Sequence, residues 1–174
     1  MDNPSEQLTG ARQNLIPFLV IVLPFVLLFF AFAITSGGPS DAKLFVEKYT
    51  ALTYAYDPAL ADLYTDTAEY KVYTMNNDGS SDLKQMTGSE VKSYTRTGMP
   101  EAAKKQIKIA YKDFTYEKSG DDVIVRARLN YADICYWDND YHMTIRKNEQ
   151  GQYQIIEERL AVPEKSQCKK ESLK

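Results

Sequence analysis

The feature that most constrains this chain is an uncharged apolar run near its N-terminus. Residues 15–34 read LIPFLVIVLPFVLLFFAFAI, and about 20 apolar residues at 1.5 Å rise per residue match the thickness of a bilayer core. Pro17 and Pro24 are compatible with a transmembrane helix, which tolerates kinks. The sequence therefore predicts a transmembrane helix over residues 15–35, behind a short tail formed by residues 1–14.

A cleaved signal peptide is the alternative interpretation of this run. Residues 31–33, AFA, have the small-x-small form of a cleavage site. A retained anchor is favoured, because the apolar run is longer than a secretory core and little positive charge precedes it. Only Arg12 precedes the run, and Lys43 and Lys48 follow it closely, so the positive-inside rule does not decide the orientation of the helix. Both interpretations predict an extracytoplasmic domain.

Composition narrows the function classes. The chain is 44% hydrophobic and 26% charged with a formal net charge of -3, which indicates a folded domain and no nucleic-acid partner. The two cysteines, Cys135 and Cys168, permit one disulfide in an oxidising compartment. A single histidine, His142, and the lack of a CxxC motif argue against a histidine-rich metal site. No metal or cofactor is predicted.

The first half of the soluble part reads as two helices and a strand. Residues 36–40 have the glycine, proline and serine content of a flexible linker, and Ser40 can cap a helix that begins at about residue 41. One face of this helix consists of Phe45, Tyr49, Leu52 and Tyr56. Asp57 and Pro58 then predict the N-cap and first residue of a second, short helix. Residues 68–75 alternate as a strand.

The second half predicts a helix followed by an antiparallel meander. After a turn-rich loop at residues 76–81, a helix is expected over residues 89–105, kinked or split at Gly98 and Pro100. Four strands follow it, at residues 107–117, 122–137, 141–148 and 153–162. These elements place one α+β domain over residues 41–163. The polar tail, residues 164–174, is expected to be disordered unless Cys168 holds it.

Two stretches of the sequence resemble a known superfamily. Residues 42–73, AKLFVEKYTALTYAYDPALADLYTDTAEYKVY, resemble the opening helix pair and first strand of nuclear transport factor 2-like (NTF2-like, including SnoaL-like) domains. Residues 86–90, MTGSE, resemble the entry to the third helix of that superfamily. The resemblance implies a cone-shaped α+β domain, in which a curved, mostly antiparallel sheet packs on about three helices.

The resemblance implies several functions. Superfamily members include ketosteroid isomerase, polyketide cyclases, dehydratases, protein-binding transport factors and bacterial membrane-anchored assembly proteins. In the isomerase a carboxylate base lies on the first strand, at the position that Val72 matches here. A valine cannot transfer a proton, so that chemistry is disfavoured. One helix before such a domain is similar to inner-membrane assembly components of type IV secretion systems.

The residue patterns supply candidate site residues. Alternation along residues 125–131 projects Asp133 onto the apolar face, where a buried carboxylate could serve as an acid or base. His142 could pair with Asp133 or with Asp140, although alternation groups His142 with Thr144 and Arg146 on the polar face. The candidates for lining a ligand pocket are Tyr73, Tyr111, Tyr131, Asp133 and Trp137. Ordinary sheet packing explains the same aromatic residues equally simply.

These observations predict a membrane-tethered accessory or assembly domain that mediates protein interaction, rather than an enzyme. It would lie on the outer side of a bacterial inner membrane, held there through residues 15–35. The sheet face that carries Arg126, Arg128 and Arg146 is the expected surface for a homodimer or for a partner in a membrane complex. The alternative is a small-molecule-binding protein, or a SnoaL-like lyase or isomerase with a tyrosine-lined pocket.

Overall fold

The computed structural model describes residues 39–168, which belong to one compact unit. The predicted tail, membrane segment and most of the linker, residues 1–38, lie outside the described residues, as do residues 169–174. Within residues 39–168, no helix has both the length and the apolar character needed to cross a membrane.

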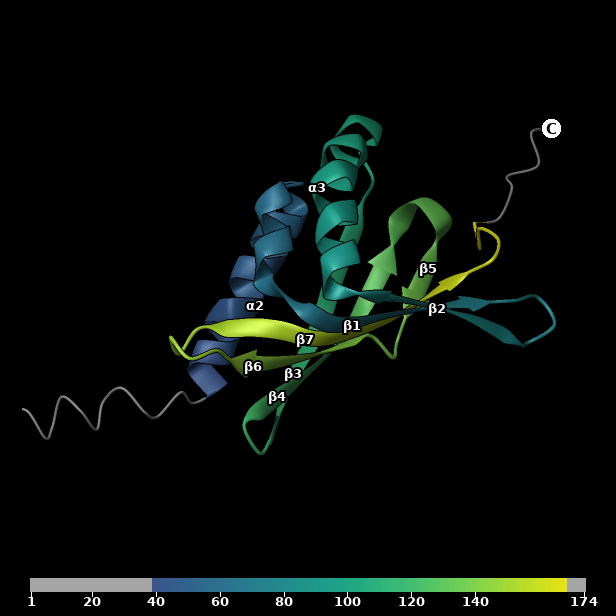
Figure 1. Ribbon diagram of the computed structural model, residues 1–174. Helices are drawn as coiled ribbons and strands as arrows, with labels where there is room; N and C mark the ends of the chain where they lie inside the picture. Colours follow the sequence, from purple (N-terminus) through teal and green to yellow (C-terminus); the bar gives the residue numbers. More distant parts are fainter. Residues whose placement is uncertain (1–38, 169–174) are drawn as a thin grey trace, which may run out of the picture. The chain divides into compact units, whose positions relative to one another are not determined.

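Two α-helices and a short 3-10 helix pack on one face of the sheet (Figure 1). Helix α2 spans Pro39–Tyr54, helix η1 spans Pro58–Leu63 and helix α3 spans Gly88–Lys105. The predicted cap of η1 is confirmed, because the Asp57 carboxylate accepts a hydrogen bond from the amide of Ala59 at 2.8 Å. The predicted split of α3 is wrong. The helix continues through Pro100, which is exposed, so water can satisfy the carbonyl that proline leaves free.

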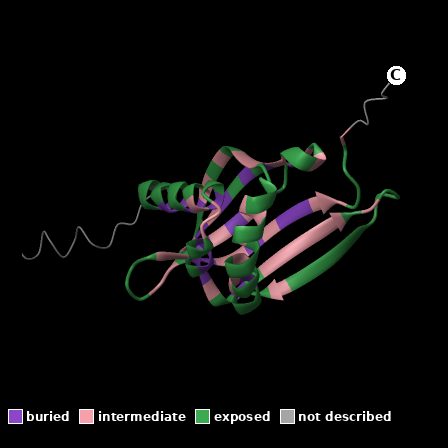
Figure 2. Cartoon of the chain, turned by 90° about the horizontal axis from the view of Figure 1, so that it is seen from above, coloured by how far each residue is buried: buried purple, intermediate pink, exposed green. Residues whose placement is uncertain are grey.

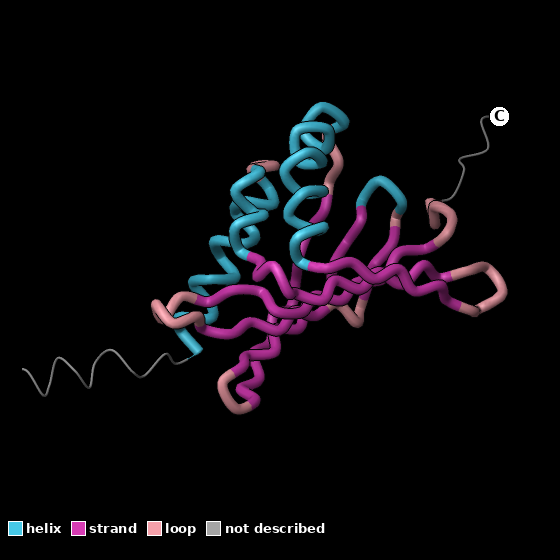
Figure 3. The backbone as a smooth tube through the Cα atoms, viewed as in Figure 1, coloured by secondary structure: helices cyan, strands magenta, loops and turns pink. Residues whose placement is uncertain are grey.

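The strands form one sheet in the order β2-β1-β7-β6-β4-β3, with β5 paired to β4 (Figure 3). Their bounds are β1 Tyr64–Met75, β2 Ser81–Thr87, β3 Ile109–Ser119, β4 Asp122–Tyr131, β5 Tyr136–Asp138, β6 His142–Lys147 and β7 Tyr153–Pro163. Strands β1 and β7 pair in parallel, and every other pair is antiparallel. This agrees with the predicted mixed α+β architecture and mostly antiparallel sheet.

Three details of the sheet differ from the predictions. Strand β1 begins at Tyr64 instead of Ala68, because a register shift between Tyr64 and Glu69 extends the pairing with β7. Strand β2 was not predicted, since its sequence, SDLKQMT, has little apolar alternation and its side chains are almost all exposed. The long strand predicted over residues 122–137 ends at Tyr131, where a 3-10 turn, η2 (Ala132–Ile134), separates β4 from β5.

The two faces of the sheet have different roles. Buried residues concentrate where the helices cover the sheet, whereas the turns and edge strand β2 are exposed (Figure 2). The core on this helix-side face includes Val125, Leu129, Met143, Ile145 and Ile155. We call the opposite side of the sheet its outer face. Strand alternation therefore decides which side chains reach the core and which reach solvent.

Gly88, at the start of α3, is the position where the backbone approaches most closely. A Cβ atom added there would lie 1.8 Å from the carbonyl oxygen of Thr65 and 2.9 Å from the amide nitrogen of Ala68. We expect Gly88→Ala to lower the free energy of unfolding by about 2–3 kcal/mol, because the backbone of β1 must move. Gly98→Ala in the same helix meets nothing within 4 Å, and should stabilise the helix by about 0.5–1 kcal/mol. Chemical denaturation of both variants checks this, and equal effects would contradict the close approach.

Candidate functional site

The centre of the core holds a carboxylate. Glu158 lies on β7 opposite Tyr70 of β1 and Met143 of β6, and only 2% of its surface is exposed. Carboxylates are rarely buried to this extent without partners, because the charged form loses its hydration. The surroundings of Glu158 therefore decide whether it serves stability or chemistry.

Three tyrosines donate hydrogen bonds to Glu158. The hydroxyls of Tyr49 and Tyr141 each donate to Oε1 at 2.8 Å, and the hydroxyl of Tyr64 donates to Oε2. The donors come from α2, from the start of β1 and from the residue preceding β6. This network therefore connects α2 and the start of β1 to β7 and to the beginning of β6. We call Glu158 with these three tyrosines the Glu158 cluster.

Tyr111 on β3 extends the cluster towards the edge of the core. Its hydroxyl oxygen lies 3.2 Å from that of Tyr49, and its ring centroid lies 5.2 Å from that of Tyr141. The Tyr111 ring also stacks on Phe114 and contacts Tyr54. Aromatic pairs at these distances add to the energy of burial. Of the predicted pocket residues, Tyr111 is the one that the structure brings to the Glu158 cluster.

Burial controls the protonation of these groups. Desolvation raises the pKa of Glu158 above its ordinary value, although the hydrogen bonds from Tyr64, Tyr49 and Tyr141 act in the opposite direction. The pKa of each of these three tyrosines is raised well above its ordinary value. Desolvation is the larger cause, and the nearby charge of Glu158 is the second. The phenols therefore stay protonated at neutral pH and remain donors. Both carboxylate oxygens are thus engaged by the protein itself.

Asp138 is a second buried carboxylate with a structural role. Its Oδ2 accepts a hydrogen bond from the amide of Ala161 at 2.6 Å, and its Oδ1 accepts one from the amide of Asp140 at 2.9 Å. The side chain thereby connects the end of β5 to β7 and closes the turn after β5. Among residues 39–168, no group of three or more histidine, cysteine or acidic side chains is arranged to hold a metal ion.

The structure separates Asp133 and His142, the predicted catalytic candidates, from the Glu158 cluster. Asp133 is exposed on η2, and its Oδ2 accepts a hydrogen bond from the amide of Lys108 at 3.1 Å. The alternation that placed it inside stops at Tyr131, where the strand ends. His142 pairs with Arg126 and Arg159 in neighbouring strands, on the outer face, and its Nδ1 lies 3.1 Å from the carbonyl oxygen of Asp140.

Two predicted pocket residues also lie on the outer face. Tyr73 is adjacent in β1 to Val72, which pairs with the buried Leu160, so the Tyr73 side chain is on the opposite side. Trp137 pairs with Asn130, the neighbour of the buried Leu129. Both side chains therefore lie on the opposite side of the sheet from the Glu158 cluster. Tyr131 does lie on the helix-side face, where it packs against the core and stacks with Tyr136 at 6.5 Å.

Sequence reasoning missed Glu158 and its three partners because a bulge interrupts β7. Counting by twos from the buried Ile155 places Glu157 in the core and Glu158 in solvent. The structure reverses this, because a register shift between β6 and β7 precedes Glu158. Counting backwards from Leu160 would have placed Glu158 correctly.

The outer face gathers cations around two aromatic rings. Lys112 Nζ lies 5.2 Å and Arg128 Cζ 4.8 Å from the centroid of the Trp137 ring. Arg159 Cζ lies 4.5 Å from the centroid of the Tyr73 ring. Contacts of this kind hold cations in place while leaving their charge available. We call this surface the cationic face. It consists of Lys112, Arg126, Arg128, Arg159, Tyr73 and Trp137.

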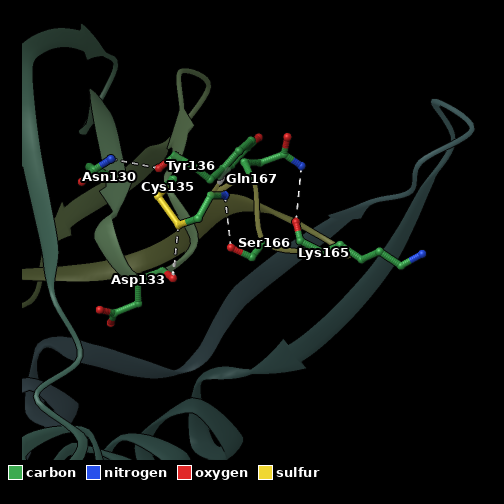
Figure 4. Close-up of a disulfide and its surroundings, with 8 residues drawn as sticks. Asn130, Asp133, Cys135, Tyr136, Lys165, Ser166 and Gln167 are labelled. Carbon is green, nitrogen blue, oxygen red and sulfur yellow. Dashed lines mark hydrogen bonds between the residues drawn. A yellow bond between two sulfur atoms is a disulfide. The ribbon is translucent and has the colours of Figure 1, made fainter. Parts of the chain in front are cut away.

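A disulfide between Cys135 and Cys168 holds the C-terminal segment beside η2 (Figure 4). The amide of Gln167 also donates to the carbonyl oxygen of Ile134 at 2.8 Å. The sequence permitted this bond without fixing its geometry. Residues 164–168 are consequently held against the domain, unlike the disordered tail expected without such a bond.

Comparison with solved structures identifies the architecture. An NTF2-like protein of unknown function from Pseudomonas putida KT2440 is 15% identical with a TM-score of 0.53, covering 71% of this chain and 85% of that chain. An NTF2-like protein from Novosphingobium aromaticivorans is 15% identical with a TM-score of 0.50, covering 88% and 92%. The described domain has the NTF2-like fold. A third NTF2-like protein, from Silicibacter pomeroyi DSS-3, is 16% identical with a TM-score of 0.50, covering 72% and 96%.

The sequence matches no known protein-family model and no curated protein. The resemblance drawn from residues 42–73 and 86–90 is therefore supported at the level of the fold. The NTF2-like fold hosts unrelated functions, so the function of this domain must be argued from its own residues.

Proposed function

We propose that this chain is a membrane-tethered accessory domain that binds another protein through the outer face of its sheet. The apolar run at residues 15–34 supplies the tether, because it has the length and the apolar character of a membrane-spanning helix. The bond between Cys135 and Cys168 supports an oxidising, extracytoplasmic location, because such bonds persist mainly in oxidising compartments.

The proposal rests on the cationic face. The helices lie on the other side of the sheet, so this face is open to solvent within the described domain. It includes Trp137, the only tryptophan of the chain. Tryptophan and arginine are the residues most enriched at the energetic centres of protein interfaces.

The Glu158 cluster supports the accessory function over a catalytic one. A general base must have a lone pair directed at its substrate. Here Oε1 already accepts two hydrogen bonds and Oε2 accepts a third, all from tyrosines of the same chain. The outward position of Asp133 removes the other carboxylate that the small-molecule alternative requires. The Glu158 cluster thus stabilises the fold, and the cations of the cationic face are available to bind another protein.

Native gel electrophoresis of detergent-solubilised membranes, carried out on the full chain expressed in its own cells, tests the proposal. We expect the chain in the membrane fraction, in a complex larger than the free chain. Trp137→Ala combined with Arg128→Ala should release the free chain, whereas Tyr94→Ala, an exposed aromatic change on α3, should leave the complex intact. A chain found in the soluble fraction, or a complex that the double change does not affect, would contradict the proposal.

A further inference from the structure

We infer that the cationic face docks an acidic polypeptide segment of the partner protein. This inference rests on the proposed function and specifies the chemistry of the partner. It follows from the register of the strands, from the pairing of the charges and from the way the two aromatic rings are covered.

The strand register places like charges side by side. Lys112 on β3 and Arg128 on β4 are direct partners, so this row places two cations on the same face of neighbouring strands. Strands lie about 4.8 Å apart, so the side chains on one face of such a row are close neighbours. Like charges directly opposite each other destabilise a sheet. A bound anion would offset this repulsion, which gives the row a physical reason to exist at a binding surface.

The chain itself neutralises few of these cations. Asp113, 3.6 Å from Arg128, is the one carboxylate within ion-pair distance of the four cations of the cationic face among residues 39–168. Arg159 instead donates to the carbonyl oxygen of Asp140 and covers the Tyr73 ring. On the next strand, Lys71 shows the opposite arrangement, because Glu69 and Glu157 both pair with it. Positive charge is therefore concentrated on this face of a chain whose net charge is -3.

The aromatic rings favour a polypeptide over a lipid surface. A tryptophan that anchors a protein to a bilayer must present its ring to the lipid interface. Here the ring of Trp137 is covered by Lys112 and Arg128, and the ring of Tyr73 is covered by Arg159. An acidic segment supplies carboxylates for the cations, and its side-chain stems supply apolar contact around the rings.

The single tryptophan makes this inference directly measurable. The full chain in dodecyl maltoside micelles is titrated with a peptide of sixteen glutamates, while the fluorescence of Trp137 is followed. We expect a saturable change that weakens as salt rises from about 0.05 M to about 0.5 M. A peptide of sixteen lysines should give no change. Arg126→Gln combined with Arg128→Gln should weaken binding by roughly ten-fold or more.

Arg146→Gln is the matched control, because Arg146 lies on the same strand face as His142 but pairs through two nitrogens with Asp122. Its affinity for the glutamate peptide should stay within about two-fold of the unmodified chain. No binding of the glutamate peptide, or equal losses in both variants, would overturn the inference. The inference would also be overturned if vesicles that contain phosphatidylglycerol shifted the emission of Trp137 without any peptide, while vesicles of phosphatidylcholine did not. If the peptide fails while the membrane complex persists, the inference fails and the proposed function stands.

Discussion

Glu158→Ala is expected to lower the free energy of unfolding at pH 7 by about 3–5 kcal/mol. The change leaves three buried phenols, those of Tyr49, Tyr64 and Tyr141, without their common acceptor, and it opens a space in the core. Loss of the unfavourable burial of the carboxylate offsets part of this cost. Urea denaturation followed by circular dichroism measures the difference.

Glu158→Gln separates the hydrogen bonds from the charge. The amide can still accept from Tyr49 and Tyr141 and can donate to Tyr64, so we expect a loss of about 1 kcal/mol or less. Because burial raises the pKa of Glu158, the folded chain binds this proton more tightly than the unfolded chain. The stability due to this group therefore falls as pH rises above about 4.3, and Glu158→Gln should remove that fall. Equal losses for the alanine and glutamine variants would contradict the hydrogen-bonded cluster.

Alkaline unfolding is expected to be steep. Burial raises the pKa of Tyr49, Tyr64 and Tyr141 well above 10, whereas the same residues in the unfolded chain ionise near 10. Above pH 10 the unfolded chain therefore binds fewer protons, so stability is lost as pH rises. These three tyrosines alone remove roughly 4 kcal/mol between pH 9 and pH 11, and Tyr70, Tyr111 and Tyr131, whose pKa burial also raises, add to the loss. Urea denaturation at a series of pH values measures this loss.

Two phenylalanine variants control for general alkaline damage. Burial also raises the pKa of Tyr70, Tyr111 and Tyr131, so Tyr49→Phe removes one of six such groups and should reduce the slope of stability against pH by about one sixth. Tyr94→Phe changes a tyrosine that is 62% exposed and should leave the slope unchanged. A slope that neither variant alters would show that the buried phenols do not set the alkaline limit.

Much of the architecture could be predicted from local signals. The Asp57-Pro58 pair predicts the start of η1. The helical spacing of apolar side chains within residues 41–56 predicts helix α2, which buries Phe45 and Tyr49. The turn at Gly120 and the alternation along β4 predict the hairpin of β3 and β4. These signals are strong because each depends on residues within one turn or one strand.

The candidate site could not be predicted in the same way, because it depends on irregularities in the strands. A bulge in β7 brings Glu158 to the helix-side face, and the end of β4 at Tyr131 turns Asp133 outward. Strand alternation has a period of two, so one irregular residue reverses every later assignment. Tyr111 faces the core because it pairs with the buried Leu129 before the register shift between Lys112 and Thr115. Arg126 and Arg128 were predicted to lie on the outer face, whereas the contacts of Arg128 with Trp137 and of Arg159 with Tyr73 depend on tertiary structure.

Site-specific photo-crosslinking in living cells tests whether the outer face of the sheet binds a different protein. A benzophenone amino acid is placed at Thr144, on the outer face beside His142, or at Tyr94, on the exposed side of α3. We expect one discrete adduct with a different protein from position 144, which the Arg126→Gln and Arg128→Gln changes together abolish, and no such adduct from position 94. An adduct from position 94 alone, or an adduct of two copies of this chain from position 144, would contradict this expectation.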